Sequence, residues 1–272
     1  TCLGEKEGKI TFQTQGLAYS NDKGETWIKY KDNPIIGNPG IKDIRDPKVS
    51  WHEASKNWIM TLAVGDHISF YASKNLIEWN KLSDFGKAIG AHGGVWECPD
   101  LFPMPLGETG EKKWVLLVSI NPGGPNGGSA TQYFIGSFDG VNFVPDDKKT
   151  RWLDYGTDNY AGVTFSNAPE NKKLFLGWMS NWDYARDTPT EVWRSAMTLP
   201  RELSLIEENG DYYLKSAPIT ALESIRVLRS SEKDIMVNGT YQTQLVPLEQ
   251  AEVYLETKLN KVFSIKIANP EG

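Results

Sequence analysis

Two acidic residues that each stand close to a proline are the first candidates for chemistry in this chain of 272 residues. Asp46 lies in Arg45-Asp46-Pro47, and Glu97 lies in Trp96-Glu97-Cys98-Pro99. Each is expected just before a buried strand, at equivalent places in a repeating pattern. Two carboxylates that lie close together raise the pKa of one of them. One protonated acid beside one ionised carboxylate is the pair that hydrolysis of a glycosidic bond requires.

A repeat of short strands is expected to position these acids. Three apolar runs that each follow a lysine-containing turn begin at Trp58, Trp114 and Leu174, and so lie 56 and 60 residues apart. Helical periodicity is almost absent, and short apolar runs separated by Gly, Asn, Asp and Pro are typical of an all-β protein. A period near this size, with about four strands in each unit, is typical of β-propeller blades, and a β-sandwich with irregular pairing is the alternative.

The first strand of each propeller blade lines the central axis, so equivalent positions on neighbouring blades meet at one end of the channel. Asp46 and Glu97 are therefore expected to lie together at that end. The segment Ser20–Trp27 is repeated, with changes, in Ser73–Trp79 and Ser137–Phe143. In each copy we expect a tight turn built on Asp or Asn, with an aromatic residue that closes the hairpin.

The repeating pattern ends after Arg201-Glu202-Leu203. Alternation of apolar residues returns between Tyr241 and Lys266, in a stretch much shorter than the ~100 residues that a two-sheet sandwich needs. We therefore predict a β-propeller over residues 1–215, a connector over residues 216–230, and the start of a C-terminal β-sandwich over residues 231–272.

Composition argues against several classes of function. The chain has 35 acidic residues against 29 Lys and Arg, a net charge of -6 and no basic block, so nucleic acid is not expected as a partner. Its apolar runs fall far short of the ~20 residues that cross a bilayer, so no membrane span is expected. Cys2 and Cys98 are too few for a disulfide framework or a four-thiolate zinc site, and we expect no metal and no cofactor. Ten Trp and 11 Tyr are suited to stacking on neutral sugars.

The motifs around the two acids resemble those of the glycoside hydrolase family 32 fructan hydrolases, which include levanases, inulinases and invertases. Arg45-Asp46-Pro47 matches the family's Arg-Asp-Pro motif, and Glu97–Leu101 matches its Glu-Cys-Pro-Asp motif. Further matches, in the family's order, are Gln15–Ser20, Asp158–Ala161, Gly177–Trp182 and Met197–Leu203. The resemblance implies a five-bladed β-propeller with the site at its axis, followed by a β-sandwich.

The same resemblance implies roles for individual residues. Glu97 is expected to be the general acid/base that protonates the leaving oxygen and then activates water. Asp46 is expected to stabilise the transition state by pairing with hydroxyls of a bound fructosyl unit, and Arg45 to donate hydrogen bonds to the same sugar. The remaining candidates for contacts with the sugar, each equally open to a structural role, are Trp182 as an aromatic wall and Tyr160 and Asp158 as polar contacts.

One departure from the family's pattern concerns the nucleophile. The family uses an aspartate in an Asn-Asp-Pro-Asn-Gly motif on its first blade, and no Asp-Pro-Asn-Gly occurs in this sequence. We therefore expect a retaining β-fructofuranosidase, acting on levan, inulin or sucrose, whose nucleophile lies outside this chain. We also expect the first blade and part of the second to be missing, the isolated chain to be inactive, and the location to be extracellular or periplasmic.

Three other functions stay open on sequence alone. An inverting propeller glycosidase acting on arabinan or xylan would release the opposite anomer. A sialidase would share the Ser-x-Asp-x-Gly-x-x-Trp pattern of Ser20–Trp27, although no clear clamp of three arginines accompanies it. A non-catalytic glycan-binding propeller would explain the absent nucleophile motif but not the retention of Glu97 and Arg45-Asp46.

Overall fold

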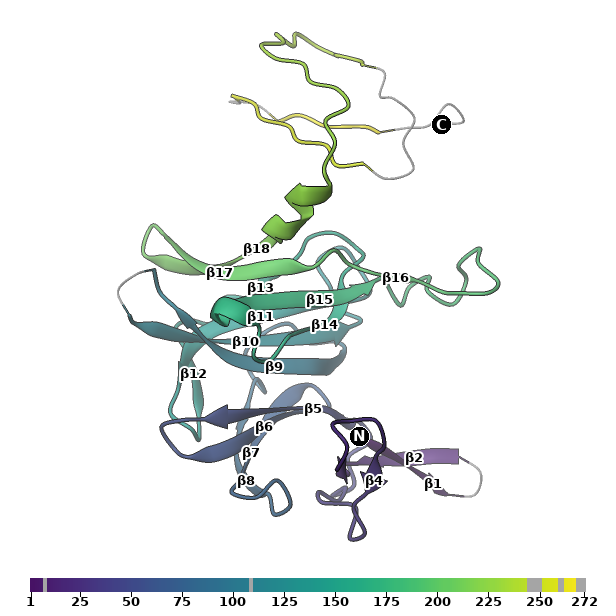
Figure 1. The fold of residues 1–272 in the computed structure, drawn as a ribbon, viewed down its shortest axis with the longest axis vertical. Coiled ribbons are helices and arrows are strands. Elements are labelled where there is room, and N and C mark those ends of the chain that lie inside the picture. The colour runs from purple at the N-terminus through teal and green to yellow at the C-terminus, as the bar shows by residue number, and fades with distance from the viewer. Residues whose placement is uncertain (7–8, 108–109, 244–250, 259–261, 268–272) are drawn as a thin grey trace. The chain divides into compact units, whose positions relative to one another are not determined.

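The computed structural model describes residues 1–6, 9–107, 110–243, 251–258 and 262–267, and nearly all of its regular structure is β-strand (Figure 1). The chain divides into two compact units, Thr1–Thr220 and Ala221–Gly272. In the first unit the described residues form three large sheets and two small ones. The small sheets are β1 (Cys2–Lys6) with β2 (Lys9–Thr14) and β3 (Ala18–Tyr19) with β4 (Ile28–Lys29).

The three large sheets are antiparallel and follow one another along the chain. The first large sheet has the order β5 (Ile44–His52), β6 (Asn57–Val64), β7 (His67–Ser73), β8 (Asn80–Phe85). The second has the order β9 (Val95–Pro105), β10 (Lys112–Asn121), β11 (Ala130–Phe138), β12 (Phe143–Pro145), with β13 (Arg151–Trp152) also pairing with β11. The third has the order β14 (Tyr160–Thr164), β15 (Lys173–Met179), β17 (Arg201–Glu208), β18 (Asp211–Pro218). The short strand β16 (Ala196–Met197) also pairs with β15, and the short helix η1 (Pro169–Asn171) lies between β14 and β15 in the chain.

The three apolar runs predicted from the sequence are the second strands of these sheets, β6, β10 and β15. Strand β10 shows why such a run is continuous. Its side chains alternate between two faces, and both faces are buried. Leu116 and Val118 pack into the core shared with the first sheet, and Val115 and Leu117 pack into the core shared with the third. The all-β, β-propeller prediction is confirmed.

The repeated turn also forms as predicted. In its first copy the carboxylate of Asp22 accepts hydrogen bonds from Ser20 Oγ (2.6 Å) and from the Thr26 amide (2.9 Å), and the Trp27 indole donates to the carbonyl of Gly24 (3.0 Å). The copy that precedes β8 uses Asn75, which accepts from the Glu78 amide (2.9 Å), while the Trp79 indole donates to the carbonyl of Leu76 (3.0 Å). In the third copy Asp139 accepts from the amides of Val141 (2.8 Å) and Asn142 (2.6 Å), and the aromatic residue is Phe143, which has no ring donor. A polar side chain that satisfies its own turn explains why this signal is readable from sequence.

The second unit has little regular structure in its described residues. The helix η2 (Thr220–Ile225) begins at the end of the first unit, and no strand is assigned to the described residues from Ala221 onward. Residues 244–250, 259–261 and 268–272 of the predicted β-sandwich lie outside the described residues. Strand β18 extends to Pro218, beyond the boundary predicted at residue 215. The connector and the β-sandwich therefore stay predictions. Within the described ranges, no helix is both long and apolar enough to cross a bilayer.

Candidate active site

Each of the three large sheets has a β-bulge near the start of its first strand. In β5, Arg45 pairs with Ala63 and Lys48 with Thr61, so two residues of β5, Asp46 and Pro47, lie opposite a single residue of β6. A bulge bends its strand and re-aims a side chain, and bulges are common next to active sites. In β9, Glu97 pairs with Ser119 and Asp100 with Leu117, so Cys98 and Pro99 form the bulge. In β14, Tyr160 pairs with Trp178 and Val163 with Leu176, so Ala161 and Gly162 form the bulge.

The first bulged residue has the same unusual backbone in all three strands. Its φ is 59° at Asp46, 47° at Cys98 and 53° at Ala161. A non-glycine residue in this left-handed region costs about 1–3 kcal/mol, and such residues cluster where function requires the strain. The three strands thus carry one repeated backbone device at the position of the candidate site.

This register corrects the predicted equivalence of the two acids. The residues at matching positions are Arg45, Glu97 and Tyr160, and Asp46 matches Cys98 instead. Both acids also lie inside their first strands rather than just before them. The physical reason is that the bulge sets the register, and its marker in the sequence is the proline after Asp46 and after Cys98. Aligning the two prolines gives the correct match.

Glu97 is held by residues from both neighbouring sheets. Its Oε1 accepts hydrogen bonds from Arg45 Nε (3.0 Å) and lies 2.9 Å from Arg45 Nη2, while its Oε2 accepts a hydrogen bond from the hydroxyl of Tyr160. Arg45 Nη1 also contacts Asp43 Oδ1 (2.6 Å). Burial disfavours the charge on Arg45, but the hydrogen bonds to Asp43 and Glu97 outweigh burial and raise the pKa of the guanidinium. Burial and the nearby charge of Glu97 raise the pKa of Tyr160, so its hydroxyl is a donor.

Asp46 is held by the bulge of the second sheet. Its Oδ2 accepts a hydrogen bond from the Cys98 amide (3.0 Å) and lies 3.6 Å from Cys98 Sγ. Burial, followed by the charges of Asp46 and Glu97, raises the pKa of the Cys98 thiol, so it is a protonated donor and not a thiolate nucleophile. The structure therefore brings Arg45, Asp46, Glu97 and Tyr160 together, and their roles in catalysis and in binding sugar stay predictions.

A buried ion pair lies beneath these bulges. Asp100, with 1% exposed side chain, accepts hydrogen bonds from the amide (2.6 Å) and hydroxyl (2.8 Å) of Thr164 and lies 3.4 Å from Lys48 Nζ. Lys48 Nζ also donates to the carbonyl of Thr164 (2.7 Å). Each of the three residues belongs to a different large sheet. We call Lys48, Asp100 and Thr164 the inter-sheet clamp.

A cleft of about 390 Å³ opens beside Glu97. Its lining residues are Arg45, Val95, Glu97, Asn121, Trp182 and Arg186. Trp182 is 43% exposed, and its ring lies 5.0 Å from that of Trp178, which in turn lies 6.3 Å from the ring of Tyr160. The predicted aromatic wall is thus part of the cleft. Sequence reasoning missed Asn121 and Arg186, whose only signals are their places after the buried run of β10 and four residues after Trp182.

Asp158 lies outside this group of contacts. Its side chain is exposed, and its carboxylate accepts a hydrogen bond from the hydroxyl of Tyr184. A role for Asp158 in binding sugar stays a prediction. Among the described residues, no group of three or more His, Cys, Asp or Glu side chains could hold a metal ion.

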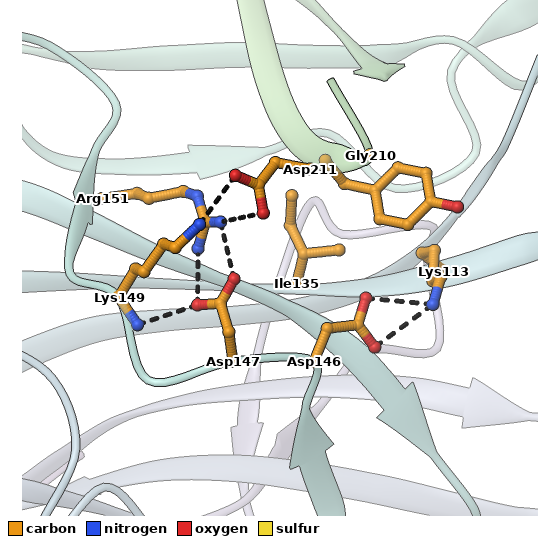
Figure 2. A pocket seen from close by; sticks show the side chains of 9 residues that line it. Lys113, Ile135, Asp146, Asp147, Lys149, Arg151, Gly210 and Asp211 are labelled. Carbon is orange, nitrogen blue, oxygen red and sulfur yellow. Dashed lines mark hydrogen bonds and ion pairs between the residues drawn. The ribbon is translucent and has the colours of Figure 1, made fainter. Parts of the chain in front are cut away.

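A second pocket, of about 210 Å³, lies between the second sheet and the start of β18 (Figure 2). Its basic side chains each meet an aspartate. The pairs are Lys113 with Asp146 (2.9 Å), Lys149 with Asp211 (2.7 Å) and Arg151 with Asp147 (2.7 Å). Because each basic side chain is paired with an aspartate, the pocket offers a ligand few unpaired groups. The pair of Lys149 with Asp211 also links the second sheet to the third.

Propeller strands that bring a glutamate and an arginine to one cleft, with an aspartate on the bulge next to that arginine, define a β-propeller with an acidic polar site. The chain belongs to glycosyl hydrolases family 32, because the model of that family's N-terminal domain matches residues 4–218. The chain is similar to a levanase of Bacillus subtilis (strain 168), with 50% identity over 231 residues that make up 83% of this chain and 34% of the levanase.

Two further relatives agree. An extracellular exo-inulinase of Meyerozyma guilliermondii is 49% identical over 200 residues, which are 72% of this chain and 38% of that protein. The solved structure of a fructofuranosidase from Schwanniomyces occidentalis, complexed with fructosylnystose, matches with a TM-score of 0.71 and 42% identity, covering 76% of this chain and 41% of that one. The chain therefore spans less than half the length of each of these relatives.

Proposed function

We propose that this chain supplies the general acid/base and the transition-state stabiliser of a retaining β-fructofuranosidase. The observation that carries the proposal is the carboxylate of Glu97, held at the cleft between Arg45 and Tyr160, with Asp46 on the neighbouring bulge. The substrates are β-fructofuranosides such as levan, inulin or sucrose, as the names of the levanase and exo-inulinase relatives suggest. The extracellular exo-inulinase likewise favours a secreted protein.

In the first step, Glu97 gives its proton to the glycosidic oxygen as the bond from that oxygen to the anomeric carbon breaks. An aspartate outside this chain attacks the anomeric carbon and forms a fructosyl ester, since the chain has no Asp-Pro-Asn-Gly segment. In the second step, Glu97 takes a proton from water, the water oxygen attacks the anomeric carbon, and fructose and the free aspartate are released.

Asp46 and Arg45 act on the fructosyl unit during both steps. Positive charge develops on the ring as the transition state becomes oxocarbenium-like. The carboxylate of Asp46, fixed by the Cys98 amide, is a preformed acceptor for sugar hydroxyls, and such groups cost no reorganisation at the moment of reaction. The planar guanidinium of Arg45 holds Glu97 and has the geometry to donate to a second acceptor on the sugar.

The test is Glu97→Gln in a full-length protein that carries these residues together with a nucleophile aspartate. Glutamine cannot transfer the proton, so kcat on sucrose or inulin is expected to fall about 10²–10⁴-fold, with the binding of fructose oligomers retained. Glu25→Gln, a change at an exposed glutamate in a turn, is the matched control. Retention of more than about a tenth of wild-type kcat would contradict the assignment, because general acid–base help is larger than that.

The anomer of the first product separates the proposal from an inverting propeller glycosidase. Time-resolved NMR of the released sugar is expected to show retained configuration. Release of the opposite anomer, or activity on arabinan or xylan alone, would favour the inverting alternative. Binding of fructans without turnover in the full-length protein would favour a glycan-binding propeller.

A further inference from the structure

A short helical turn carries two of the residues that line the cleft, Trp182 and Arg186. The amides of Tyr184 and Ala185 both donate to the carbonyl of Asn181, at 3.2 and 2.9 Å. Asn181 is buried, and its side chain accepts from the Ser129 amide (3.2 Å) and donates to the carbonyl of Thr157 (2.9 Å). Ala185 is also buried, so this turn has one inward side and one outward side.

Trp182 and Arg186 lie on the outward side of that turn. They are four residues apart, and side chains at this spacing on a helical turn are neighbours. The guanidinium carbon of Arg186 lies 5.7 Å from the centre of the Trp182 ring, within the range of a cation–π interaction. Both side chains are exposed, and both line the cleft that contains Glu97.

The two arginines of the cleft differ in how their charge is satisfied. The guanidinium of Arg45 is paired with Asp43 and Glu97. Across the described parts of the chain, the side chain of Arg186 has no carboxylate partner and no hydrogen bond, and its contact is the ring of Trp182. An arginine carries five N–H donors in a planar fork, so those of Arg186 are free for a ligand.

We propose that Arg186 determines specificity for the leaving group by donating hydrogen bonds to hydroxyls of the sugar that departs. This inference rests on the proposed function. The groups expected to hold the fructosyl unit are partly or fully buried around Glu97: Arg45 has 19% of its side chain exposed and Tyr160 is 2% exposed. Trp182 and Arg186 line the same cleft but are exposed, Trp182 to 43%. The sugar on the far side of the scissile oxygen therefore meets these two residues.

The chemistry of the pair suits a neutral sugar. The Trp182 ring offers an apolar surface to the C–H face of a pyranose or furanose ring. The guanidinium of Arg186 extends that surface and adds a planar set of donors for vicinal hydroxyls. Fructans and sucrose differ in the sugar at this position, so a donor there changes the preference between them.

The experiment compares two leaving groups in Arg186→Ala and Arg186→Lys, using the full-length protein described above. Sucrose has a leaving group rich in hydroxyls, whereas methyl β-D-fructofuranoside has the same fructosyl unit and a leaving group with none. Loss of a hydrogen bond to a charged donor is expected to lower kcat/KM for sucrose about tenfold or more in Arg186→Ala. The value for the methyl glycoside is expected to stay within about twofold, since its leaving group has no hydroxyl to lose a bond. Lysine keeps the charge but not the fork, so Arg186→Lys should recover part of the loss.

Arg229→Ala, a change at an exposed arginine in the second unit, is the matched control and should leave both values unchanged. Equal losses on the two substrates would overturn the inference, because the contact would then be with the fructosyl unit. Unchanged values on both would overturn it as well. If the unmodified protein hydrolyses neither substrate, the proposed function fails and the inference fails with it.

Discussion

The carboxylates of Asp46 and Glu97 are each fixed by a residue from the next sheet. Glu97, on the second sheet, accepts hydrogen bonds from Arg45 on the first and Tyr160 on the third, and Asp46 on the first accepts one from the amide of Cys98 on the second. These contacts fix the side-chain rotamer of each acid. Their positions depend on how the sheets meet, which makes both of them sensitive to changes that leave their own strands intact.

Asp46→Asn tests the electrostatic role at the scale of one residue. The amide oxygen of asparagine can still accept a hydrogen bond from the Cys98 amide, so the fold should be preserved. The negative charge that stabilises the positive charge developing on the sugar ring is lost. We expect kcat to fall about 10²–10³-fold, as for loss of one preorganised group in other sites. Asp234→Asn is a matched control because Asp234 has a similar φ of 57° and lies in the second unit. Rescue of the variant by azide, with inversion of the anomer, would instead identify Asp46 as a nucleophile.

Asp46 and Glu97 were candidates from their places in the repeat, and Arg45 and Trp182 were added by the resemblance of their motifs to the family. The prolines after Asp46 and Cys98 and the aromatic cluster around Trp182 set local backbone and packing, so the motif and the geometry coincide. Arg186 was not predictable in the same way. Its place depends on a turn that begins at Asn181, five residues earlier. That turn is fixed by the burial of Asn181 and by the contact of Asn181 with Ser129, and neither leaves a local pattern in the sequence.

At the scale of elements, the inter-sheet clamp ties the three bulged strands together. Asp100 is almost fully buried, so removal of its carboxylate leaves the Thr164 amide without its acceptor and the Lys48 ammonium without its counter-ion. Breaking a buried pair by removing one partner is strongly destabilising, whereas replacing both partners by apolar groups is often neutral. The clamp is thus expected to matter more for where the bulges sit than for the net stability of the sheets.

We expect Asp100→Ala to lower the free energy of unfolding by about 3 kcal/mol, and the double variant Lys48→Met/Asp100→Leu to recover most of that loss. Urea unfolding of the wild type, Lys48→Met, Asp100→Leu and the double variant gives the coupling between the two residues directly, because these four proteins form a closed cycle. Lys74→Met, at an exposed lysine on the turn after β7, is the control. A single variant within about 0.5 kcal/mol of the wild type, the range of ordinary surface changes, would show that the pair contributes no clamp.

The strands were predictable where apolar residues run without interruption, as in β10, and the turns where a polar side chain satisfies its own backbone, as around Asp22. The bulges were not, because two residues opposite one break the alternation on which strand register is read. That single interruption is why the sequence pattern matched Asp46 with Glu97, whereas the strand register matches Arg45 with Glu97.

At the scale of the whole molecule, the proposal requires a nucleophile that the 272 residues do not supply in its usual motif. We expect the isolated chain to release no fructose from levan, inulin or sucrose, because the first displacement has no attacking carboxylate. The measurement is fructose release by the purified chain, repeated with the N-terminal segment of the Bacillus subtilis levanase joined ahead of Thr1. Activity gained only in the joined protein would support the proposal. Activity of the chain alone would mean that another carboxylate, with Asp158 as the first suspect, acts as nucleophile.

The repeated bulge makes this site modular. One backbone position holds Arg, Glu and Tyr in successive sheets, and the next holds Asp, Cys and Ala, with the same left-handed conformation in each copy. The backbone geometry of the bulge therefore does not depend on the side chain, since three different residues occupy the same position with the same conformation. Six side chains, two in each sheet, can therefore differ in charge and size while the bulge that carries them keeps the same backbone.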